Sequence, residues 1–406
     1  MKRRLLALAL CAAVCGCGGG GMSGAETAAP VAAAPSSDDT AALQAAVDKG
    51  GVVTLDARTY HTSKTITISH SNTVIQGAGP GTVIEFKATH APYIHCGNDR
   101  AITTPCDLDD VLPRRIAQPI AVGDTSFVAT DDASDVQPGE WLLINDYDNV
   151  YGDRAAVDWM KVDYVDGDVV HLQTAFRMPF TTAREWIAGK SGLGFTRINR
   201  LVENVELRNF TVSVPDTGNP EDIGAGVSIF MALNTLIDHV DSNSAHAQPL
   251  YTYLSKGVTI YNSQGAGGSL NEFASSVDMS ICHNHFQAQG AGFGLDLGAG
   301  FFDVCDNEVT QSENAGAYML YSVHDGKFRD NRIDYVDATA GLSAVGILAR
   351  GAQNVEISGN YMVGGAGTAS AGISVGGVEG EIYVPPTGVT LTGNMFGEGW
   401  VSEENQ

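Results

Sequence analysis

The chain has 406 residues, and its 47 acidic residues outnumber its 23 basic residues to give a formal net charge of −24. This excess of negative charge repels nucleic acid and anionic lipid over most of the surface, which excludes both as general partners. Only 17% of the residues are charged and 48 are Gly, a composition typical of a fold with many tight turns.

The first residues predict an export signal. Residues 1–16 open with three basic positions and continue as an apolar stretch that is too short to span a bilayer. The segment Val14-Cys-Gly-Cys17 resembles a bacterial lipobox. That resemblance implies a lipid on Cys17 as the only link to a membrane, the outer one in a cell with two. Residues 17–36 then form a flexible tether. Secretion without a lipid is the alternative.

Residues 37–87 predict an N-terminal cap and the first strands of the main fold. Residues 38–47 have the pattern of a short helix, with Asp38 or Asp39 as its N-cap. A helix in this position would cover the open strand edge at the end of a stack of strands.

Residues 88–190 interrupt that pattern and predict a small antiparallel β-domain inserted between early coils, beside the expected groove. The dipeptide Asp166-Gly167 is a hairpin turn signal. The expected strands are residues 121–128, 139–144 and 160–172.

Residues 191–406 contain a short phrase that returns five times, with an apolar residue three before an Asn and another two after it. Consecutive copies are 23, 24, 29 and 34 residues apart, which indicates stacked units with insertions. The apolar residues alternate as in strands, so the chain is predicted to be an all-β protein, a parallel β-helix. We expect the Asn residues to be structural, at tight bends, where Asn tolerates a left-handed backbone and its amide can bond the next coil. They are Asn284, Asn307, Asn331, Asn360 and Asn394.

Four cysteines lie beyond the signal region, and an exported protein meets an oxidising compartment in which they are expected to pair. Cys282 and Cys305 hold the same place in consecutive repeats. A strand spacing of about 4.8 Å brings their Cα atoms within disulfide range. We predict the disulfides Cys282–Cys305 and Cys96–Cys106. The alternative for the first pair is two stacked free thiols.

The segment "DDTAALQAAVDKGGVVTLDARTYHTSKTITI", followed by "VIQGAGPGTVIEF", resembles the N-terminal module of the pectate-lyase-like superfamily. With the Asn repeat, this resemblance covers residues 37–86 and 191–400. It implies a right-handed parallel β-helix and activities found among polysaccharide lyases, family 28-type hydrolases, C5-epimerases and phage tailspikes.

The enzymes of that superfamily work on the outer face of one long sheet. The strands expected to form that sheet here are residues 226–230, 251–255, 269–274, 294–297, 318–322, 345–350 and 372–376. Strand alternation places six candidates on the outer face, each uncertain by one position. They are Tyr251, Tyr253, Asn271, Asp296, Tyr321 and Arg350.

Hydrolysis by acid–base catalysis needs two carboxyl groups about 5–10 Å apart. Glu272 and Asp296 lie on neighbouring coils and are candidates for such a pair. The alternative is that Glu272 is a solvated loop residue. The Asn-Thr-Asp, Gly-His-Gly and Arg-Ile-Lys motifs of family 28 hydrolases are missing from the coil sequence, which argues against a polygalacturonase.

Proton abstraction beside a uronate carboxylate needs a base and a cation to offset the carboxylate charge. The candidate catalytic residues for this chemistry are His246, Tyr253, Lys256 and Arg350. The candidate substrate-binding residues are Tyr251, Tyr321, His324, Arg197 and Arg200. A basic window contains Arg177, Arg184, Lys190, Arg197, Arg200 and Arg208. An anionic ligand and salt bridges at the junction of insert and coil are the two interpretations of this window.

The sequence therefore predicts an extracytoplasmic, monomeric protein that acts on an acidic, uronate-containing polysaccharide by β-elimination or a related proton abstraction. A non-catalytic polysaccharide-binding protein of the cell envelope is the first alternative, and a hydrolase using Glu272 and Asp296 is the second. No cofactor is evident, no cluster has zinc spacing, and Ca²⁺ is a possible ion.

Overall fold

The computed structural model describes most of the chain beyond the predicted signal and tether. Cys17, Cys96, Cys106, Arg184 and Lys190 lie outside the described residues. No helix among the described residues is long and apolar enough to cross a membrane. The described residues are 38–87, 100–105, 114–130, 132–147, 154–180, 192–198, 200–218, 224–288, 290–313, 315–337, 345–365, 370–377, 385–398 and 400–405.

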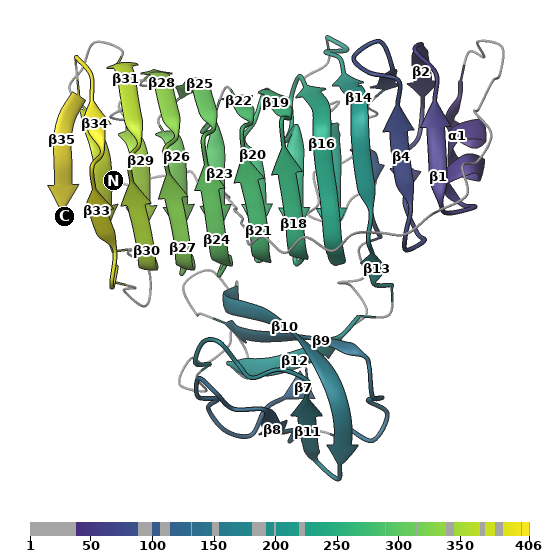
Figure 1. Ribbon diagram of the computed structural model, residues 1–406, viewed down its shortest axis with the longest axis vertical. Helices are drawn as coiled ribbons and strands as arrows, with labels where there is room; N and C mark the ends of the chain where they lie inside the picture. Colours follow the sequence, from purple (N-terminus) through teal and green to yellow (C-terminus); the bar gives the residue numbers. More distant parts are fainter. Residues whose placement is uncertain are drawn as a thin grey trace, which may run out of the picture.

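The main body is a coil of parallel strands that stack side by side along one axis (Figure 1). One face is a sheet of ten strands, one for each coil. It contains β3 (Ile66–Thr67), β6 (Arg100–Thr103), β15 (Ala225–Phe230), β17 (Leu250–Tyr253), β20 (Asn271–Ala274), β23 (Phe293–Asp296), β26 (Ala315–Leu320), β29 (Val345–Arg350), β32 (Ser370–Gly376) and β35 (Trp400–Asn405).

The remaining faces form a sheet of nineteen strands, in which most coils contribute two consecutive strands separated by a bend. All pairings in both sheets are parallel, which confirms the predicted parallel β-helix. The nineteen strands are β1 (Val52–Leu55), β2 (Thr59–Thr62), β4 (Val74–Gly77), β5 (Val83–Phe86), β13 (Val202–Glu203), β14 (Glu206–Val214), β16 (Ala232–Ser244), β18 (Lys256–Tyr261), β19 (Gln264–Gly267), β21 (Val277–Cys282), β22 (His285–Ala288), β24 (Gly300–Cys305), β25 (Glu308–Glu313), β27 (His324–Arg329), β28 (Arg332–Asp337), β30 (Gln353–Ser358), β31 (Tyr361–Gly365), β33 (Thr390–Thr392) and β34 (Met395–Phe396).

The interior of the coil is filled by apolar side chains that stack on their equivalents one coil away. Ile237, Ile260 and Ile281 are register partners in consecutive strands, and all three are fully buried. Every second residue of each strand points inward. The side chains between them face outward, so the register of each strand decides which residues are available to a ligand.

The recurring Asn residues form a continuous ladder inside the coil. Nδ2 of Asn284 donates to Oδ1 of Asn307 at 3.0 Å, and Asn307 repeats this bond to Asn331 at 2.9 Å. The ladder continues through Asn360 to Asn394 with bonds of 3.0 Å. Each step is reinforced by a bond from the backbone N–H of one Asn to the same oxygen of the next.

The bend itself differs from the prediction. The left-handed backbone conformation belongs to the residue before each Asn, because the Asn must keep its side chain turned inward to reach the next coil. The residues with positive φ are His283, Asp306, Asp330, Gly359 and Gly393.

The coil is capped at its N-terminal end by the helix α1 (Thr40–Val47), which buries Leu43 and Val47 (Figure 1). The N-cap position is Asp39, whose side chain makes no capping bond. It is buried and pairs instead with Arg58 at 2.9 Å. Asp38 Oδ1 accepts the bond from the N–H of Thr40 at 2.9 Å.

The insert projects from one side of the coil as a separate antiparallel sheet (Figure 1). Gly167 takes a positive φ in the turn between two of its strands, as the hairpin signal predicts. Arg100–Thr103 pairs in the coil and Leu193–Arg197 pairs in the insert. The described strands of the insert therefore occupy Arg114 to Arg197, whereas the expected range was 88–190. In spatial order the strands are β7 (Arg114–Arg115), β12 (Leu193–Arg197), β9 (Trp141–Tyr147), β10 (Arg154–Asp166), β11 (Val169–Leu172) and β8 (Ser126–Val128).

Cys282 and Cys305 form a disulfide between neighbouring coils, with a Cα–Cα distance of 4.6 Å. The bond closes a loop of 23 residues, for which the chain-entropy model gives about 3 kcal/mol of stabilisation. We therefore expect the Cys282→Ser, Cys305→Ser variant to unfold at lower denaturant concentration, with a loss of about 3 kcal/mol. Unfolding of both proteins in guanidinium chloride measures this, and equal midpoints would contradict it.

Candidate functional site

The strands expected to carry the groove do lie together in the ten-stranded sheet. Its register aligns Tyr251 with Glu272 in one outward row, and Tyr253 with Ala274 and then Asp296 in a second row. Arg350 lies further along the second row. The prediction that Asn271 faces outward is wrong by one position. Its buried amide donates inside the coil to the carbonyl oxygens of Gly265 and Gly292, at 3.1 and 3.0 Å.

The outer face of this sheet is not an open groove where the candidate carboxyl groups lie. Glu272 is 1% exposed and Asp296 is 0% exposed, so the interpretation of Glu272 as a solvated loop residue is also wrong. Glu272 accepts a hydrogen bond from Nε2 of Gln248. Oδ1 of Asp296 accepts one from the N–H of Leu297 at 2.6 Å. Since they lie on adjacent strands two positions apart, their Cα atoms are separated by roughly 8 Å.

Part of the cover over this sheet comes from the insert. Leu143 on β9 and Trp159 on β10 belong to one buried apolar cluster with Phe230, Tyr251 and Tyr253 of the sheet. The two tyrosines therefore point away from the coil axis, as predicted, but they contribute to the packing of insert against coil. They offer no open surface for stacking on a sugar ring.

Arg100 is a buried residue of this sheet that the sequence did not single out. Its Nη1 donates to Oγ of Ser228 at 2.7 Å, and its guanidinium lies 4.7 and 5.2 Å from the ring centres of Phe230 and Tyr251. Residue 100 falls within the range 88–190 expected for the insert. The apolar pair Ala101-Ile102 in an extended stretch is the only signal that could have placed it in a coil.

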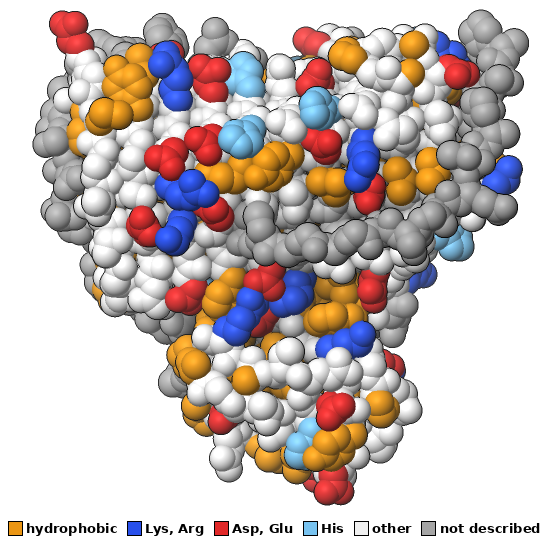
Figure 2. Space-filling view, viewed as in Figure 1, with side chains coloured by type: hydrophobic (Ala, Val, Ile, Leu, Met, Phe, Trp, Pro, Cys, Tyr) orange, Lys and Arg blue, Asp and Glu red, His pale blue; other side chains and the backbone are white. Residues whose placement is uncertain are grey.

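Lys256 takes part in an ion-pair network where the insert meets the coil. Its Nζ lies 2.7 Å from Asp278 and 3.3 Å from the buried Asp158, and Arg177 contacts both carboxylates. Figure 2 shows basic and acidic side chains gathered at this junction. The ammonium group of Lys256 thus contacts two carboxylates and links the coil to the insert.

Several other members of the basic window are also paired with carboxylates. Arg197 lies in β12 and bonds Glu140 through Nε at 3.0 Å and Asp135 through Nη1 at 2.6 Å. Arg208 pairs with Glu206 at 2.7 Å. The structure thus supports salt bridges as the interpretation of these arginines. Arg200 is exposed between β12 and β13.

Two further candidates lie at the start of β27, with Tyr321 in the bend before the strand and His324 as its first residue. Tyr321 is half-buried there and has a positive φ. His324 is buried, with its Nδ1 3.1 Å from Oδ2 of Asp325 and its ring edge against Phe301. Neither residue lines the cavity at the end of β14, β16, β19 and β22. Arg350, the remaining candidate of the ten-stranded sheet, donates from Nη2 to Oγ of Ser374 at 3.0 Å.

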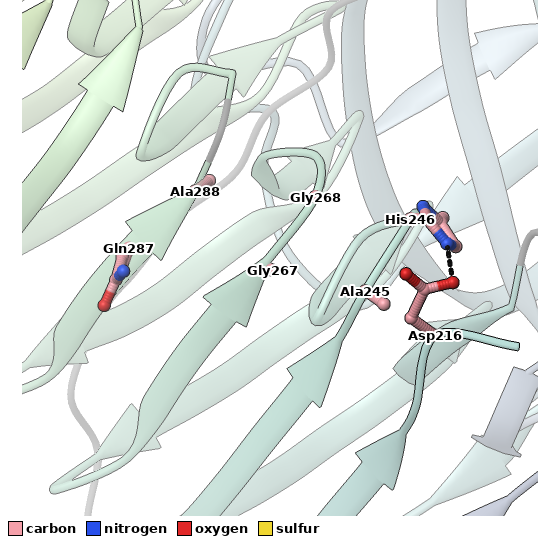
Figure 3. A pocket seen from close by; sticks show the side chains of 7 residues that line it. All are labelled: Asp216, Ala245, His246, Gly267, Gly268, Gln287 and Ala288. Atoms are coloured by element: carbon pink, nitrogen blue, oxygen red, sulfur yellow. Dashed lines mark hydrogen bonds and ion pairs between the residues drawn. The ribbon is translucent and has the colours of Figure 1, made fainter. Parts of the chain in front are cut away.

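A cavity of 440 Å³ opens at the corner of the coil where β14, β16, β19 and β22 end (Figure 3). Gly268 forms part of its floor, and a Cβ atom on this glycine would lie 2.1 Å from the carbonyl oxygen of Ala245. Only Gly therefore allows the coils to approach this closely here. The described lining residues are Asp216, Ala245, His246, Gly267, Gly268, Gln287 and Ala288.

The candidate base His246 lies in this cavity beside a carboxylate. Its Nε2 is 2.9 Å from Oδ1 of Asp216 (Figure 3). The hydrogen bond from His246 lowers the pKa of Asp216, and the N–H of Gly218, at 2.7 Å, lowers it further. Where Nε2 carries the ring proton and donates a hydrogen bond to this carboxylate, Nδ1 keeps its lone pair and can accept a proton.

The cavity wall and the buried sheet are connected through one loop. Gln248, which bonds Glu272, lies two residues after His246 in the connection between β16 and β17. Among the described residues, no group of three or more His, Cys, Asp or Glu side chains is placed to hold a metal ion. Ca²⁺ stays a prediction.

The fold defines the chain as a right-handed parallel β-helix protein, and solved phage tailspikes share this architecture. The Gp54 tailspike of Acinetobacter baumannii bacteriophage AP22, in complex with capsular saccharide, has a TM-score of 0.52 and 14% identity. The match covers 91% of this chain and 70% of the AP22 tailspike chain. The Pseudomonas phage phi297 tailspike gp61 has a TM-score of 0.50 and 13% identity, over 91% and 70%.

The tailspike gp49 of Pseudomonas phage LKA1 is 16% identical with a TM-score of 0.49, over 83% of this chain. The match spans 60% of the LKA1 tailspike. No protein-family model matches the sequence, and no curated protein is similar to it in sequence. At these identities the likeness establishes the fold alone.

Proposed function

We propose that this protein is exported and acts on an acidic polysaccharide by taking a proton from a sugar ring, with His246 as the base. The observation that carries the proposal is the bond between His246 and Asp216 at the wall of the cavity. An imidazole oriented by a carboxylate is suited to general base catalysis. Lipid attachment at Cys17 and a monomeric state belong to the same proposal.

In the proposed reaction, Nδ1 of His246 takes the proton from the ring carbon that bears the uronate carboxyl group. The electron pair of that C–H bond becomes a C=C bond as the glycosidic oxygen on the neighbouring carbon leaves with the electrons of its C–O bond. The leaving oxygen takes a proton from solvent, and Asp216 stabilises the imidazolium. If the electron pair instead stays on the ring carbon and its carboxyl group as an enolate, a proton delivered from solvent to the opposite face of that carbon gives an epimer.

The charge of the uronate carboxylate must be offset for this proton to become acidic enough. None of the described lining residues is Lys or Arg. We therefore propose that Ca²⁺, which prefers carboxylate and other oxygen ligands, supplies this charge when it is bound with the polymer. Asp216 is the carboxylate in the lining that could share such an ion.

A non-catalytic polysaccharide-binding protein is the second candidate. The observation that favours it is that Tyr251, Tyr253, Glu272 and Asp296 are buried. They lie on the sheet whose outer face forms the substrate groove in enzymes of the pectate-lyase-like superfamily. The same burial counts against hydrolysis by Glu272 and Asp296, because a carboxyl pair must reach the glycosidic bond. Reducing-sugar release at the normal rate by Asp296→Asn would remove that hydrolase hypothesis.

The main test of the proposal is the His246→Gln variant. Loss of a general base lowers kcat by about 10²–10⁴-fold, and we expect a fall of this size in the ultraviolet absorbance of unsaturated uronate products. Asp216→Asn should lower the rate less, since the imidazole remains. For epimerisation, proton exchange with deuterated water measures the same step.

The matched control is His239→Gln, which changes a histidine that also lies beside an aspartate, with Nδ1 2.8 Å from Asp238. His239 does not line the cavity, so this variant should keep the full rate. Wild-type protein that binds uronate polymers without product or exchange would establish the non-catalytic alternative. Equal rates for His246→Gln and wild type would show that His246 is not the base.

A further inference from the structure

We propose that a polysaccharide chain binds along the outer face of β19, β22, β25, β28 and β31, on the nineteen-stranded sheet and not on the ten-stranded sheet. These strands follow the bend in five successive coils. Their register forms one outward row of five residues. In coil order the row contains Gln264, His285, Glu308, Arg332 and Tyr361.

The row is accessible along its length, in contrast to the buried outer face of β17, β20 and β23. Glu308 and Arg332 are exposed, and Gln264 and His285 are half-buried. The residues between them, such as Phe286 and Val309, point into the core. Figure 2 shows hydrophobic, basic, acidic and histidine side chains following one another across the upper part of this face.

The side chains of this face suit the hydroxyl groups of sugars. A second outward row runs beside the first and contains Gln287, Thr310 and Asp334. Nε2 of His285 lies 2.7 Å from Oγ1 of Thr310. Amide, hydroxyl and imidazole groups both donate and accept hydrogen bonds, as sugar hydroxyl groups do. A face with this chemistry can bond several hydroxyl groups of a ring at once.

The far end of the row provides an apolar contact. Tyr361 is 38% exposed and is the register partner of Met395, which is 56% exposed. An exposed tyrosine presents a rigid apolar ring with a polar tip, a combination that is common at binding surfaces. We assign to Tyr361 the stacking contact with one sugar ring.

The spacing of the row matches a linear glycan. Neighbouring strands are about 4.8 Å apart, which is close to the advance of one pyranose unit along an extended glycan chain. Each coil can therefore meet about one sugar unit. The match requires the chain to run parallel to the coil axis.

The row leads toward the cavity that contains His246. Gln287 lies in the second outward row and also lines the cavity, so a chain bound on this face can place one of its units there. In this respect the inference rests on the proposed function and names where the rest of the same polymer binds.

The charges on this face nearly cancel, which predicts the character of binding. Arg332 lies 3.3 Å from Glu308 and 2.8 Å from Asp334. The named side chains leave one negative charge in excess and a uronate polymer is itself anionic, so hydrogen bonds and stacking must outweigh a weak repulsion, and affinity should rise slightly as salt is added. A basic groove would lose affinity steeply as salt is added.

The test is calorimetric binding of a dimer-to-octamer series of oligogalacturonates and oligomannuronates to the full chain. For wild-type protein we expect affinity to rise with length up to about one sugar for each of the five strands, from their spacing of about 4.8 Å. Tyr361→Ala and Arg332→Ala should each weaken binding of the longest oligomers about tenfold and leave the dimer unaffected.

Two matched controls lie off the face. Tyr164→Ala removes an exposed tyrosine from the insert, and Lys327→Ala removes an exposed cation from β27, before the bend. Both should bind as wild type does. Tyr361 and Arg332 variants that bind every length as wild type does, or a wild-type affinity that does not rise with length, would overturn the inference.

The binding test separates this inference from the proposed function. His246→Gln should keep the length-dependent affinity and lose turnover, whereas Tyr361→Ala should weaken binding of long oligomers and raise the substrate concentration needed for half-maximal turnover. Binding that depends on Tyr361 without any turnover by wild-type protein would reject His246 catalysis and retain the binding face.

Discussion

Replacing Asn307 by Ala is expected to lower the free energy of unfolding by about 3–5 kcal/mol, because several buried groups lose their partners together. The side chain of Asn307 donates to Asn331 and to the carbonyl oxygen of Ile281, and it accepts from the backbone and side-chain N–H groups of Asn284. Each buried group left without a hydrogen bond costs about 1–3 kcal/mol. Chemical denaturation followed by circular dichroism measures the loss.

The matched control is Asn394→Ala at the end of the ladder. Asn394 accepts two bonds from Asn360 and donates one to Ile357, but it is only partly buried. Water can replace its bonds, so the expected loss is about 1 kcal/mol. Equal losses for Asn307→Ala and Asn394→Ala would show that burial of the ladder is not the source of its effect.

Replacing Asp158 by Ala is expected to release the insert from the coil. Asp158 is fully buried on β10 and bonds Arg177 of the insert and Lys256 of the coil. Removing one partner from a buried ion pair costs at most about 3–5 kcal/mol here, because Arg177 and Lys256 keep Asp278 as a shared partner. Limited proteolysis should cleave the variant first at the junction of insert and coil.

The control for this variant is Asp135→Ala. Asp135 also contacts two arginines, Arg114 and Arg197, but it is exposed and all three residues lie in the insert. Exposed pairs contribute about 0–1 kcal/mol, so its proteolysis should match wild type. A junction that is equally resistant in Asp158→Ala would show that the apolar cluster alone holds the insert.

The same junction should weaken in acid. Burial tends to raise the pKa of Asp278, but the charge of Lys256 and the hydrogen bond from Arg177 outweigh it, so this pKa is lowered. A lowered carboxyl pKa adds stability that is complete above the unfolded value of about 3.9 and is lost as pH falls through the folded value. Proteolysis with an acid-active protease should therefore open the junction as the pH falls below about 4. In Asp278→Asn this pH dependence should be reduced.

The β-helix could be predicted from the sequence because every coil requires the same residue types at the same positions. Each copy needs an inward Asn and apolar residues at fixed distances from it, and these needs are visible as a repeat in a single chain. The strand alternation left the inward or outward direction of each side chain uncertain by one position. For this reason Asn271 was predicted to face outward, where Glu272 does. The amide turned inward to bond Gly265 and Gly292, and the carboxylate turned outward.

The candidate site could be predicted only in part, because its residues come from separate coils. His246 was expected, but Asp216 lies 30 residues before it and outside any repeat. The pairing of Arg177 with Asp278 spans 101 residues and depends on how the insert rests on the coil. No local pattern records such contacts, so the basic window had two interpretations until the carboxylates around it were located.

The Asn ladder also has a consequence for the evolution of molecular size. The side chain of each Asn in the ladder accepts hydrogen bonds from the Asn of one neighbouring coil and donates one to the Asn of the other. Nothing in this arrangement limits the number of Asn residues in the ladder. The block that begins at Asn307 and ends before Asn331 is 24 residues long. Duplication of such a block would add one Asn that makes the same hydrogen bonds to its neighbours. A gene encoding this architecture can therefore gain or lose whole coils while the contacts inside the coil are conserved.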